Sequence, residues 1–352
     1  MKKNKILKPK KENKIGLTVI QGNKDKDYQE ELLDPKAAGG TEILARRVFK
    51  ELPELCEQFN WVLSYEKVKP DPNKPTLLWM HETPFDAGIH QNFKNPEYWQ
   101  KYIKIIFVSY WQQQMFNILY GIPYERSIVI PNAIDPIMIQ NKPNADRIKL
   151  IYASTPHRGL NILIDTLDGE EFESINWELS VFSSFKLYNR GSQDLEYQEL
   201  FDRCEKNPNI HYHGAQSNSV VRDVMADSHI FTYPCKYMET SCITAIEAMS
   251  AGNVVICPNY GALPETTSNF SWAYNWEEDE ERHRHIFGHI LRDAIINYNQ
   301  PNIKEMINLQ KVYADTFYSW AGRIPLWKQV MEAILKSVDT YKNQEPPTPQ
   351  AV

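Results

Sequence analysis

The sequence predicts an α/β protein made of two Rossmann-like domains that face a central cleft. Two observations support this prediction. The chain has 352 residues, which is roughly the length of two ordinary domains. Short apolar runs alternate with helical stretches along most of it, and this order indicates parallel sheets with crossover helices. Ligands of such sheets bind beyond the carboxyl ends of the strands, so two facing domains place a substrate between them.

The first predicted domain covers residues 15–140. It opens with a buried strand at 16–21, and the glycine pair Gly39 and Gly40 follows a polar loop. A helix over 41–55 is expected next, because its apolar residues recur at helical spacing and Thr41 is a suitable N-cap. The later elements expected here are strands at 61–64, 77–80, 105–109 and 127–130, with a helix over 111–119.

The second predicted domain covers residues 145–315 and follows a linker at 138–147 that is rich in Asn, Lys and Pro. From residue 277 the chain is expected to be helical, and a last helix at about 320–338 is expected to pack back on the first domain, anchored by Trp320 and Trp327. The other elements expected here are strands at 150–153, 177–182, 210–212, 230–233 and 254–257, with helices over 160–167, 195–204, 219–225 and 243–250.

The composition is that of a folded, water-soluble enzyme. Hydrophobic residues make up 42% of the chain and charged residues 24%, close to the averages for globular proteins. No apolar run approaches the roughly 20 residues that span a bilayer, and the N-terminus lacks the apolar segment of a signal peptide. The five cysteines are scattered, with no pair at the spacing of a zinc site. We therefore expect a cytoplasmic protein with reduced thiols.

Charge is distributed unevenly. Residues 1–14 contain seven lysines and one glutamate, and since the whole chain has a formal charge of −6, the remainder carries −12. An acidic body argues against nucleic acid as a partner. We expect 1–14 and 340–352 to be disordered tails, and the basic one allows a peripheral contact with anionic lipid or polyphosphate.

The most informative stretch for function surrounds two glutamates, Glu239 and Glu247. A helix is expected to begin near residue 240, so Glu239 lies in the preceding loop and Glu247 about two turns into the helix, where they reach opposite ends of one elongated ligand. The free N–H groups at the helix start suit a phosphate or a sugar hydroxyl. The residues expected there are Thr240, Ser241, Cys242 and Ile243.

These residues resemble the family-4-like retaining glycosyltransferases of GT-B fold. The resemblance lies in two glutamates separated by seven residues, in Glu-Ala-Met-Ser-Ala-Gly at 247–252 and in Gly-Ala-Leu-Pro-Glu at 261–265. Gly-Gly-Thr-Glu at 39–42, Phe-Val-Ser at 107–109 and Ile-Pro-Asn-Ala-Ile-Asp at 130–135 also look like family motifs. The resemblance implies a hexosyltransferase-like enzyme that moves a sugar from a nucleoside-diphosphate sugar to an acceptor hydroxyl, with the nucleotide in the second domain and the acceptor in the first.

The resemblance also implies roles for individual residues. Glu239 would contact the donor sugar, Glu247 the ribose, Arg158 the diphosphate and His81 the region near the sugar, and Gly39 and Gly40 would bind the donor through their backbone. Glu239, His81 and Arg158 are therefore the expected catalytic residues. The sequence departs from the family in two places. His157 is a weak substitute for the second diphosphate-binding cation, and Thr-Ser-Cys at 240–242 replaces the usual Gly-Phe-Gly, so sugar specificity does not carry over.

Other functions remain open at this point. A nucleotide-sugar epimerase or phosphorylase of the same fold, and a non-catalytic sugar-nucleotide-binding protein, would share these motifs; a glycosyltransferase that uses its basic tail to bind nucleic acid is a further alternative. We expect no cofactor and no metal ion. His283, His285 and His289 are interpreted as a solvated helix surface rather than a metal site. The donor base, the sugar and the acceptor, whether glycan, lipid-linked or small molecule, are not specified by the sequence.

Overall fold

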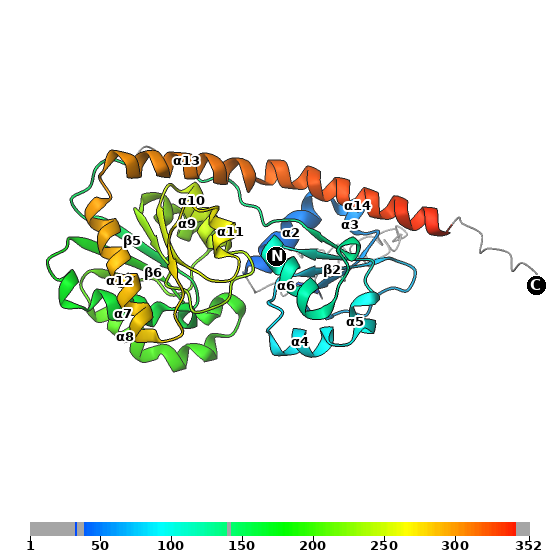
Figure 1. Cartoon of the computed structure of the whole chain (residues 1–352), viewed down its shortest axis with the longest axis horizontal. Coiled ribbons are helices and arrows are strands. Elements are labelled where there is room, and N and C mark those ends of the chain that lie inside the picture. Colours follow the sequence, from blue (N-terminus) through cyan, green and yellow to red (C-terminus); the bar gives the residue numbers. More distant parts are fainter. Residues whose placement is uncertain (1–31, 34–38, 139–141, 343–352) are drawn as a thin grey trace, which may run out of the picture.

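The computed structural model describes residues 32–33, 39–138 and 142–342, with side chains up to residue 338. The expected strand at 16–21, the basic tail at 1–14 and most of the C-terminal tail lie outside the described residues. Two parallel sheets with their helices form two layered bodies that lie side by side (Figure 1). The α/β class with two Rossmann-like units, predicted from the alternation of elements, is confirmed.

The first sheet has four parallel strands in the order β1-β2-β3-β4. Each strand is almost entirely buried, which explains why the strands appear in the sequence as short continuous apolar runs. The strands are β1 (Asn60–Leu63), β2 (Thr76–Met80), β3 (Lys104–Phe107) and β4 (Ser127–Val129), and the helices are α2 (Gly40–Glu51), α3 (Pro53–Cys56), α4 (Ala87–Phe93), α5 (Pro96–Gln100) and α6 (Tyr110–Tyr120).

The prediction of one helix over 41–55 with Thr41 as N-cap is wrong. Gly39 is the N-cap of α2, and Thr41 is the second helical residue. The helix stops at Glu51 because Pro53 has no N–H to continue the hydrogen-bond ladder. Proline is tolerated in a first turn, so a separate short helix, α3, begins there.

The second sheet has six parallel strands in the order β10-β9-β8-β5-β6-β7. This is the order of a doubly wound fold. Successive strands are added on one side of β5 as far as β7 and then on its other side from β8 onward, so ligands are expected beyond the carboxyl ends of β5 and β8. The strands are β5 (Ile148–Ala153), β6 (Trp177–Phe182), β7 (Ile210–Tyr212), β8 (Ile230–Thr232), β9 (Val254–Asn259) and β10 (Trp272–Asn275), and the helices are α7 (Leu160–Leu167), α8 (Gln198–Lys206), α9 (Asn218–Asp227), α10 (Ile243–Ser250), α11 (Leu263–Thr267) and α12 (Glu280–Asn297).

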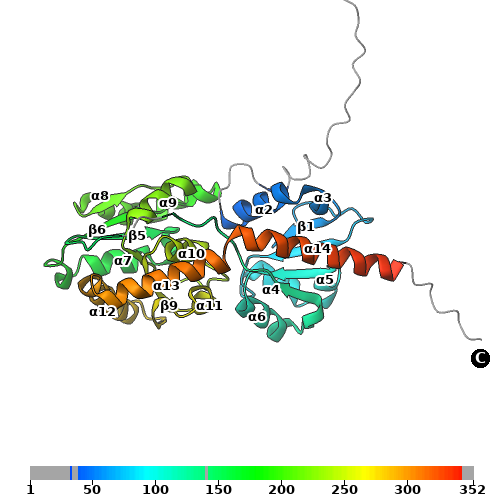
Figure 2. The same cartoon turned by 90° about the horizontal axis from the view of Figure 1, so that it is seen from above.

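Two C-terminal helices run along one side of the molecule and join its halves (Figures 1 and 2). α13 (Pro301–Phe317) lies over the second sheet's half and α14 (Trp320–Lys342) over the first. Trp327 is buried, and its ring lies 4.6 Å from that of Trp79 in β2. The predicted return of the last helix to the first sheet, anchored by these tryptophans, is therefore observed.

The two chain segments that cross between the halves are paired with each other. The backbone N–H of Ile134 donates to the carbonyl of Tyr318 over 2.8 Å, and Trp320 returns a bond to the carbonyl of Ile134 over 3.1 Å. Ile134 and Tyr318 also share a small buried cluster with Ile246 of α10. This pairing and the cluster tie the two crossing segments together where the halves meet.

Candidate active site

The crevice between the two sheets contains two adjoining cavities. The first has a volume of about 210 Å³ and the second about 670 Å³. They share six lining residues from both halves of the chain, so they form one elongated site. The shared residues are Gly40, Ser154, Arg158, Tyr188, Ile243 and Thr244.

Arg158 lies where the two cavities meet. It ends a short 3₁₀ turn after β5 and is followed by Gly159, whose φ of +111° is left-handed. A Cβ on Gly159 would lie 1.9 Å from the carbonyl oxygen of Pro234, so only glycine allows the loops after β5 and β8 to approach this closely. The sequence Arg-Gly at this point is therefore required to bring the guanidinium to the crevice.

The Arg158 guanidinium is held by a carboxylate and an aromatic ring. Its Nη1 donates to Oε1 of Glu239 over 2.7 Å, and its Cζ lies 4.4 Å from the centre of the Tyr237 ring. Burial by itself lowers the pKa of Arg158, but the Glu239 carboxylate together with Tyr233, Tyr188 and Cys235 raises it well above its usual value. A guanidinium has five N–H donors, so a permanently charged donor set remains available to an anion in the crevice.

Glu239 is positioned by a glycine turn. Gly261, at φ +60°, packs so closely on Glu239 that a Cβ would lie 2.4 Å from its carbonyl oxygen, and the N–H of Ala262 donates to that oxygen over 2.8 Å. The residue is 6% exposed, and its carboxylate also accepts a 2.5 Å hydrogen bond from the hydroxyl of Tyr233. The glycine of the 261–265 motif thus places the carboxylate in the second cavity.

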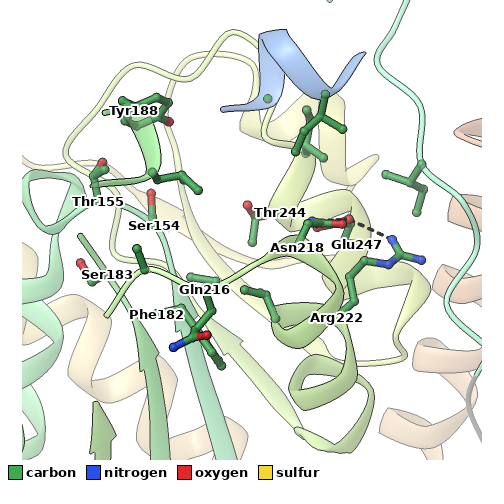
Figure 3. A pocket seen from close by; sticks show the side chains of 18 of the residues that line it. Ser154, Thr155, Phe182, Ser183, Tyr188, Gln216, Asn218, Arg222, Thr244 and Glu247 are labelled. Carbon is green, nitrogen blue, oxygen red and sulfur yellow. Dashed lines mark hydrogen bonds and ion pairs between the residues drawn. The ribbon is translucent and has the colours of Figure 1, made fainter. Parts of the chain in front are cut away.

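Glu247 lines the first cavity from the middle of α10 and is 5% exposed (Figure 3). It accepts hydrogen bonds from Asn218 Nδ2 over 3.1 Å and from Arg222 Nη1 over 2.9 Å. Burial raises the pKa of Glu247, while the bonds from Arg222 and Asn218 act against that shift. Arg222 also donates to the carbonyl of Asp135 over 2.6 Å, in the segment that crosses between the halves.

Sequence reasoning missed Asn218 and Arg222. They lie four residues apart on one face of α9, which is a recognisable polar pair. Nothing local connects that pair with Glu247, because the three side chains meet only when α9 packs beside α10. Both predicted glutamates and Arg158 do line the crevice, at different places along it.

Two helix N-termini open into the crevice. α2 begins at Gly40 and has no side-chain cap. Its start lies very close to the other half, because a Cβ on Gly40 would lie 2.9 Å from the Ile243 side chain and a Cβ on Gly39 would lie 2.7 Å from the Tyr188 ring. α10 begins at Ile243, as the helix expected over 243–250 does, and not near Thr240 as assumed when the two glutamates were placed. The buried residues 240–242 precede that helix and line the second cavity.

Thr240 makes a contact that the sequence did not indicate. Its hydroxyl donates to the carbonyl of His81, at the end of β2, over 2.7 Å. From the same half as Thr240, Glu265 accepts hydrogen bonds from the N–H groups of Tyr110 over 2.8 Å and of Trp111 over 2.7 Å, at the start of α6 in the other half. Both contacts join the two halves, and Thr240 and His81 also line the second cavity.

The two histidines of the predicted site are neutral at pH 7. His81 lines the second cavity, and burial lowers its pKa to about 3. His157 stacks on the ring of Phe185, 5.3 Å away, and burial together with Arg158 lowers its pKa to about 4. In this structure a neutral His157 adds no positive charge to that of Arg158.

The described residues contain no group of three or more His, Cys, Asp or Glu side chains placed to hold a metal ion. The interpretation of His283 as solvated is wrong, since it is buried and bonded to the hydroxyl of Tyr274 over 2.8 Å; His285 and His289 are exposed. An Asp-Lys-Asp triplet at 25–27, a spacing that could hold a divalent cation, lies outside the described residues. The five cysteines are buried free thiols.

Along the described part of the chain, no helix combines the length and the apolar character that crossing a bilayer requires.

Comparison with known proteins finds a family resemblance in the second half of the chain. Residues 139–285, somewhat less than half of the chain, match the model of glycosyl transferases group 1. The match covers the second sheet from its start to its last strand and includes Arg158, Glu239 and Glu247.

Solved structures share the GT-B fold. A glycosyltransferase from Rickettsia africae aligns with a TM-score of 0.60 at 14% identity, over 85% of this chain and 81% of that one. Anabaena HepE, solved in complex with UDP-glucose, aligns with a TM-score of 0.57 at 16% identity, over 75% of this chain and 72% of that one. These identities establish the fold alone.

One curated relative is a component of the human phosphatidylinositol N-acetylglucosaminyltransferase. It is 25% identical over 167 residues, which is 46% of this chain and 33% of the relative. The match thus spans about a third of that protein's length.

Proposed function

We propose that this protein is a retaining glycosyltransferase that moves a sugar from a uridine-diphosphate sugar to an acceptor hydroxyl. The observation that carries the proposal is the position of Arg158, which lies at the junction of the two cavities with Glu239 on one side and Glu247 on the other. UDP or UDP-glucose bound in similar structures supports the choice of donor.

The donor spans the crevice in this proposal. The nucleoside occupies the first cavity, where ribose hydroxyls donate to Glu247, whose negative charge Arg222 maintains. The diphosphate lies at Arg158 and at the uncapped start of α2, since an anion is stabilised at a helix N-terminus. The donor sugar then reaches Glu239, beside His81 and residues 240–243. In the domain division we propose, residues 145–315 hold the nucleotide, and 15–140 with the last helix hold the acceptor.

The chemistry follows from that placement. The bond between the sugar's anomeric carbon and the β-phosphate oxygen breaks, and a bond to the acceptor oxygen forms on the same face. The departing diphosphate gains negative charge and takes the proton of the acceptor hydroxyl, so UDP and the glycoside are the products. The Arg158 guanidinium and the α2 amides are oriented toward the place where this charge develops, which is where electrostatic stabilisation is most effective. Trapping a glycosyl-enzyme adduct would contradict the same-face mechanism.

The primary test offers the protein a panel of UDP-, GDP- and ADP-sugars and measures binding and turnover with and without acceptors. We expect UDP-sugars to bind and to be hydrolysed slowly, with faster turnover when an acceptor is added. Interconversion of sugars without acceptor would indicate an epimerase, orthophosphate-dependent release a phosphorylase, and binding without turnover under any acceptor a binding protein.

Metal independence is part of the proposal. Arg158 supplies the positive charge that a divalent cation would otherwise provide at the diphosphate. Turnover is expected to be unchanged by EDTA. A loss of activity that Mg²⁺ or Mn²⁺ restores would contradict this part and would direct attention to the Asp-Lys-Asp triplet at 25–27.

A further inference from the structure

Tyr233 is a buried residue of the second cavity that has no role in the mechanism proposed so far. It directly follows β8, is 1% exposed and lines this cavity. Its backbone N–H donates to the carbonyl of Ile256 in β9 over 2.9 Å, so the residue is fixed to the second sheet. Glu239, in contrast, lies on the loop between β8 and α10. A functional side chain on a loop is placed accurately when a group on a rigid element holds it.

The hydroxyl of Tyr233 and the guanidinium of Arg158 bind the same oxygen of Glu239. Tyr233 donates to Oε1 over 2.5 Å, and Arg158 Nη1 donates to Oε1 over 2.7 Å. Among the described residues none donates to the other oxygen, Oε2, and Oε2 is not fully enclosed by protein. Two donors at Oε1 therefore fix the carboxylate and leave Oε2 as its acceptor for a ligand in the cavity.

The two donors differ in what the proposed reaction asks of them. Arg158 also binds the diphosphate in that proposal, so a bound donor competes with Glu239 for the guanidinium. Tyr233 has one proton to give, and its position at the strand end directs that proton to Glu239. Burial, and after it Cys235 and Glu239, raise the pKa of Tyr233 well above its usual value, while Arg158 acts against the shift. The hydroxyl therefore stays protonated and remains a donor.

We infer that Tyr233 is a positioning residue of the transfer reaction, whose hydroxyl holds the Glu239 carboxylate so that Oε2 accepts a hydroxyl of the donor sugar. The inference rests on the proposed function and adds a residue that acts through Glu239 without touching the sugar. A tyrosine that only satisfied a buried carboxylate would contribute to stability and would have no effect on the reacting sugar. The two roles therefore differ in what the loss of the hydroxyl changes.

The first experiment removes the hydroxyl alone. It uses the full chain and a nucleotide sugar that the wild type hydrolyses or transfers. In Tyr233→Phe we expect kcat to fall about tenfold, the scale of one lost hydrogen bond to a charged group. The Kd for UDP, which lacks the sugar, should stay within about twofold, and this also shows that the variant is folded. A near-normal kcat would overturn the inference.

The matched control is Tyr274→Phe. It also removes one buried side-chain hydrogen bond in the same half, the 2.8 Å bond between Tyr274 and His283, and Tyr274 lines neither cavity. Both kcat and the Kd for UDP should stay within about twofold in this variant. A tenfold loss of kcat here as well would mean that any lost hydrogen bond in this half slows the reaction, and it would remove the special role of Tyr233.

A double-variant cycle tests whether Tyr233 acts through Glu239. Glu239→Ala removes the carboxylate, so adding Tyr233→Phe should lower kcat by less than about a further twofold. A tenfold loss in both backgrounds would overturn the inference. If Glu239→Ala does not bind UDP, Glu239→Gln replaces it. An uncharged amide is a weaker acceptor than a carboxylate, so Tyr233→Phe should then cost a smaller factor than in the wild type.

Donor analogues locate the effect on the sugar. Each hydroxyl of the donor sugar is replaced by hydrogen in turn, and turnover is compared between the wild type and Tyr233→Phe. The analogue that lacks the hydroxyl accepted by Glu239 should be slow in the wild type. The same replacement should cost at least about threefold less in Tyr233→Phe, because the carboxylate is no longer held. Equal losses in both proteins for every analogue would contradict the inference.

The outcomes distinguish this inference from the proposed function. A wild type that binds no nucleotide sugar would remove both. A wild type that turns over a nucleotide sugar, with Tyr233→Phe losing affinity for UDP as strongly as it loses turnover, would make Tyr233 a structural part of the nucleotide site. That result would remove this inference alone.

Discussion

The two cavities of the crevice differ in which half of the chain supplies their polar groups. In the first, the polar lining comes mainly from the C-terminal half, while the N-terminal half contributes mostly small or apolar residues such as Gly40, Ile43 and Ala133. In the second, both halves supply polar side chains, with Glu82 and His81 facing Arg158 and Glu239. The polar groups of the first cavity therefore belong mainly to one half, whereas those of the second come together only when the halves meet.

The contacts within each cavity agree with this difference. Glu247 is held by Asn218 and Arg222 from the neighbouring helix of the same half. Around the second cavity, the hydrogen bonds from Thr240 to His81 and from the α6 amides to Glu265 cross between the halves. We therefore expect changes in the first cavity to act mainly on nucleotide binding, and changes at the cross-contacts to act mainly on transfer.

The largest effect is expected at Arg158 and Glu239, where the cavities meet. Arg158→Ala and Glu239→Gln should each lower turnover at least about a hundredfold, the scale of losing one electrostatic stabiliser. Because the two side chains are 2.7 Å apart, the double variant should lose less than the sum of the two losses in activation free energy. Steady-state transfer rates measure this. Near-normal turnover in either single variant would remove that residue from the site.

The next largest effect is expected at Arg222, which tests the first cavity alone. Arg222→Ala leaves the Glu247 carboxylate buried without its cation, so the free energy of unfolding should fall by about 3 kcal/mol and the Kd for UDP should rise at least about tenfold. Calorimetry and denaturant unfolding give the two values. Arg203→Ala, which breaks exposed ion pairs with Asp165 and Asp168 in the same half, is the control and should cost under about 1 kcal/mol.

Glu265 tests the dependence of the second cavity on the contact between halves. Its carboxylate accepts two hydrogen bonds from the start of α6, a position where negative charge is also favoured by the helix dipole. Glu265→Ala should lower acceptor-dependent transfer about tenfold while the Kd for UDP changes by less than about twofold. The exposed Glu278→Ala is the control. A variant that lost UDP affinity as strongly as transfer would break the distinction between the two cavities.

The elements of the second sheet could be predicted closely, and the reason is burial. β6, β7, α7 and α10 occur at the residues expected. Buried apolar residues alternate along β6 at Trp177, Leu179 and Val181, and α7 and α10 are buried along most of their length. β10 was missed since Tyr274 is its one buried residue, which leaves no apolar run to detect. The helix over 41–55 was predicted too long because its apolar spacing continues past Pro53.

The site could be predicted only where it coincides with a motif. Arg158, Glu239 and Glu247 lie in stretches that resemble known glycosyltransferases. Asn218 and Arg222 do not, and they lie 25 or more residues before Glu247 in sequence.

His81 is expected to give an effect that depends on pH. Burial lowers the pKa of His81 from 6.5 to about 3 in the folded protein. Between pH 6.5 and 3 the unfolded chain binds a proton at His81 that the folded protein does not bind. The contribution of His81 to stability is therefore present above pH 6.5 and is lost as the pH falls toward 3. In His81→Gln the free energy of unfolding should decline less steeply between pH 6.5 and 4, by about 1 kcal/mol per pH unit.

Turnover gives the matching test in the second cavity. Because His81 is already neutral at pH 5, its titration cannot shape the rate profile between pH 5.5 and 8. His81→Gln should therefore lower turnover by a constant factor across that range and leave the profile's shape unchanged. A pH-dependent limb that disappears in the variant would mean that His81 carries a proton in the working enzyme. Binding of the donor would then change the surroundings of His81, unlike those of Glu247, whose hydrogen bonds are already formed in this structure.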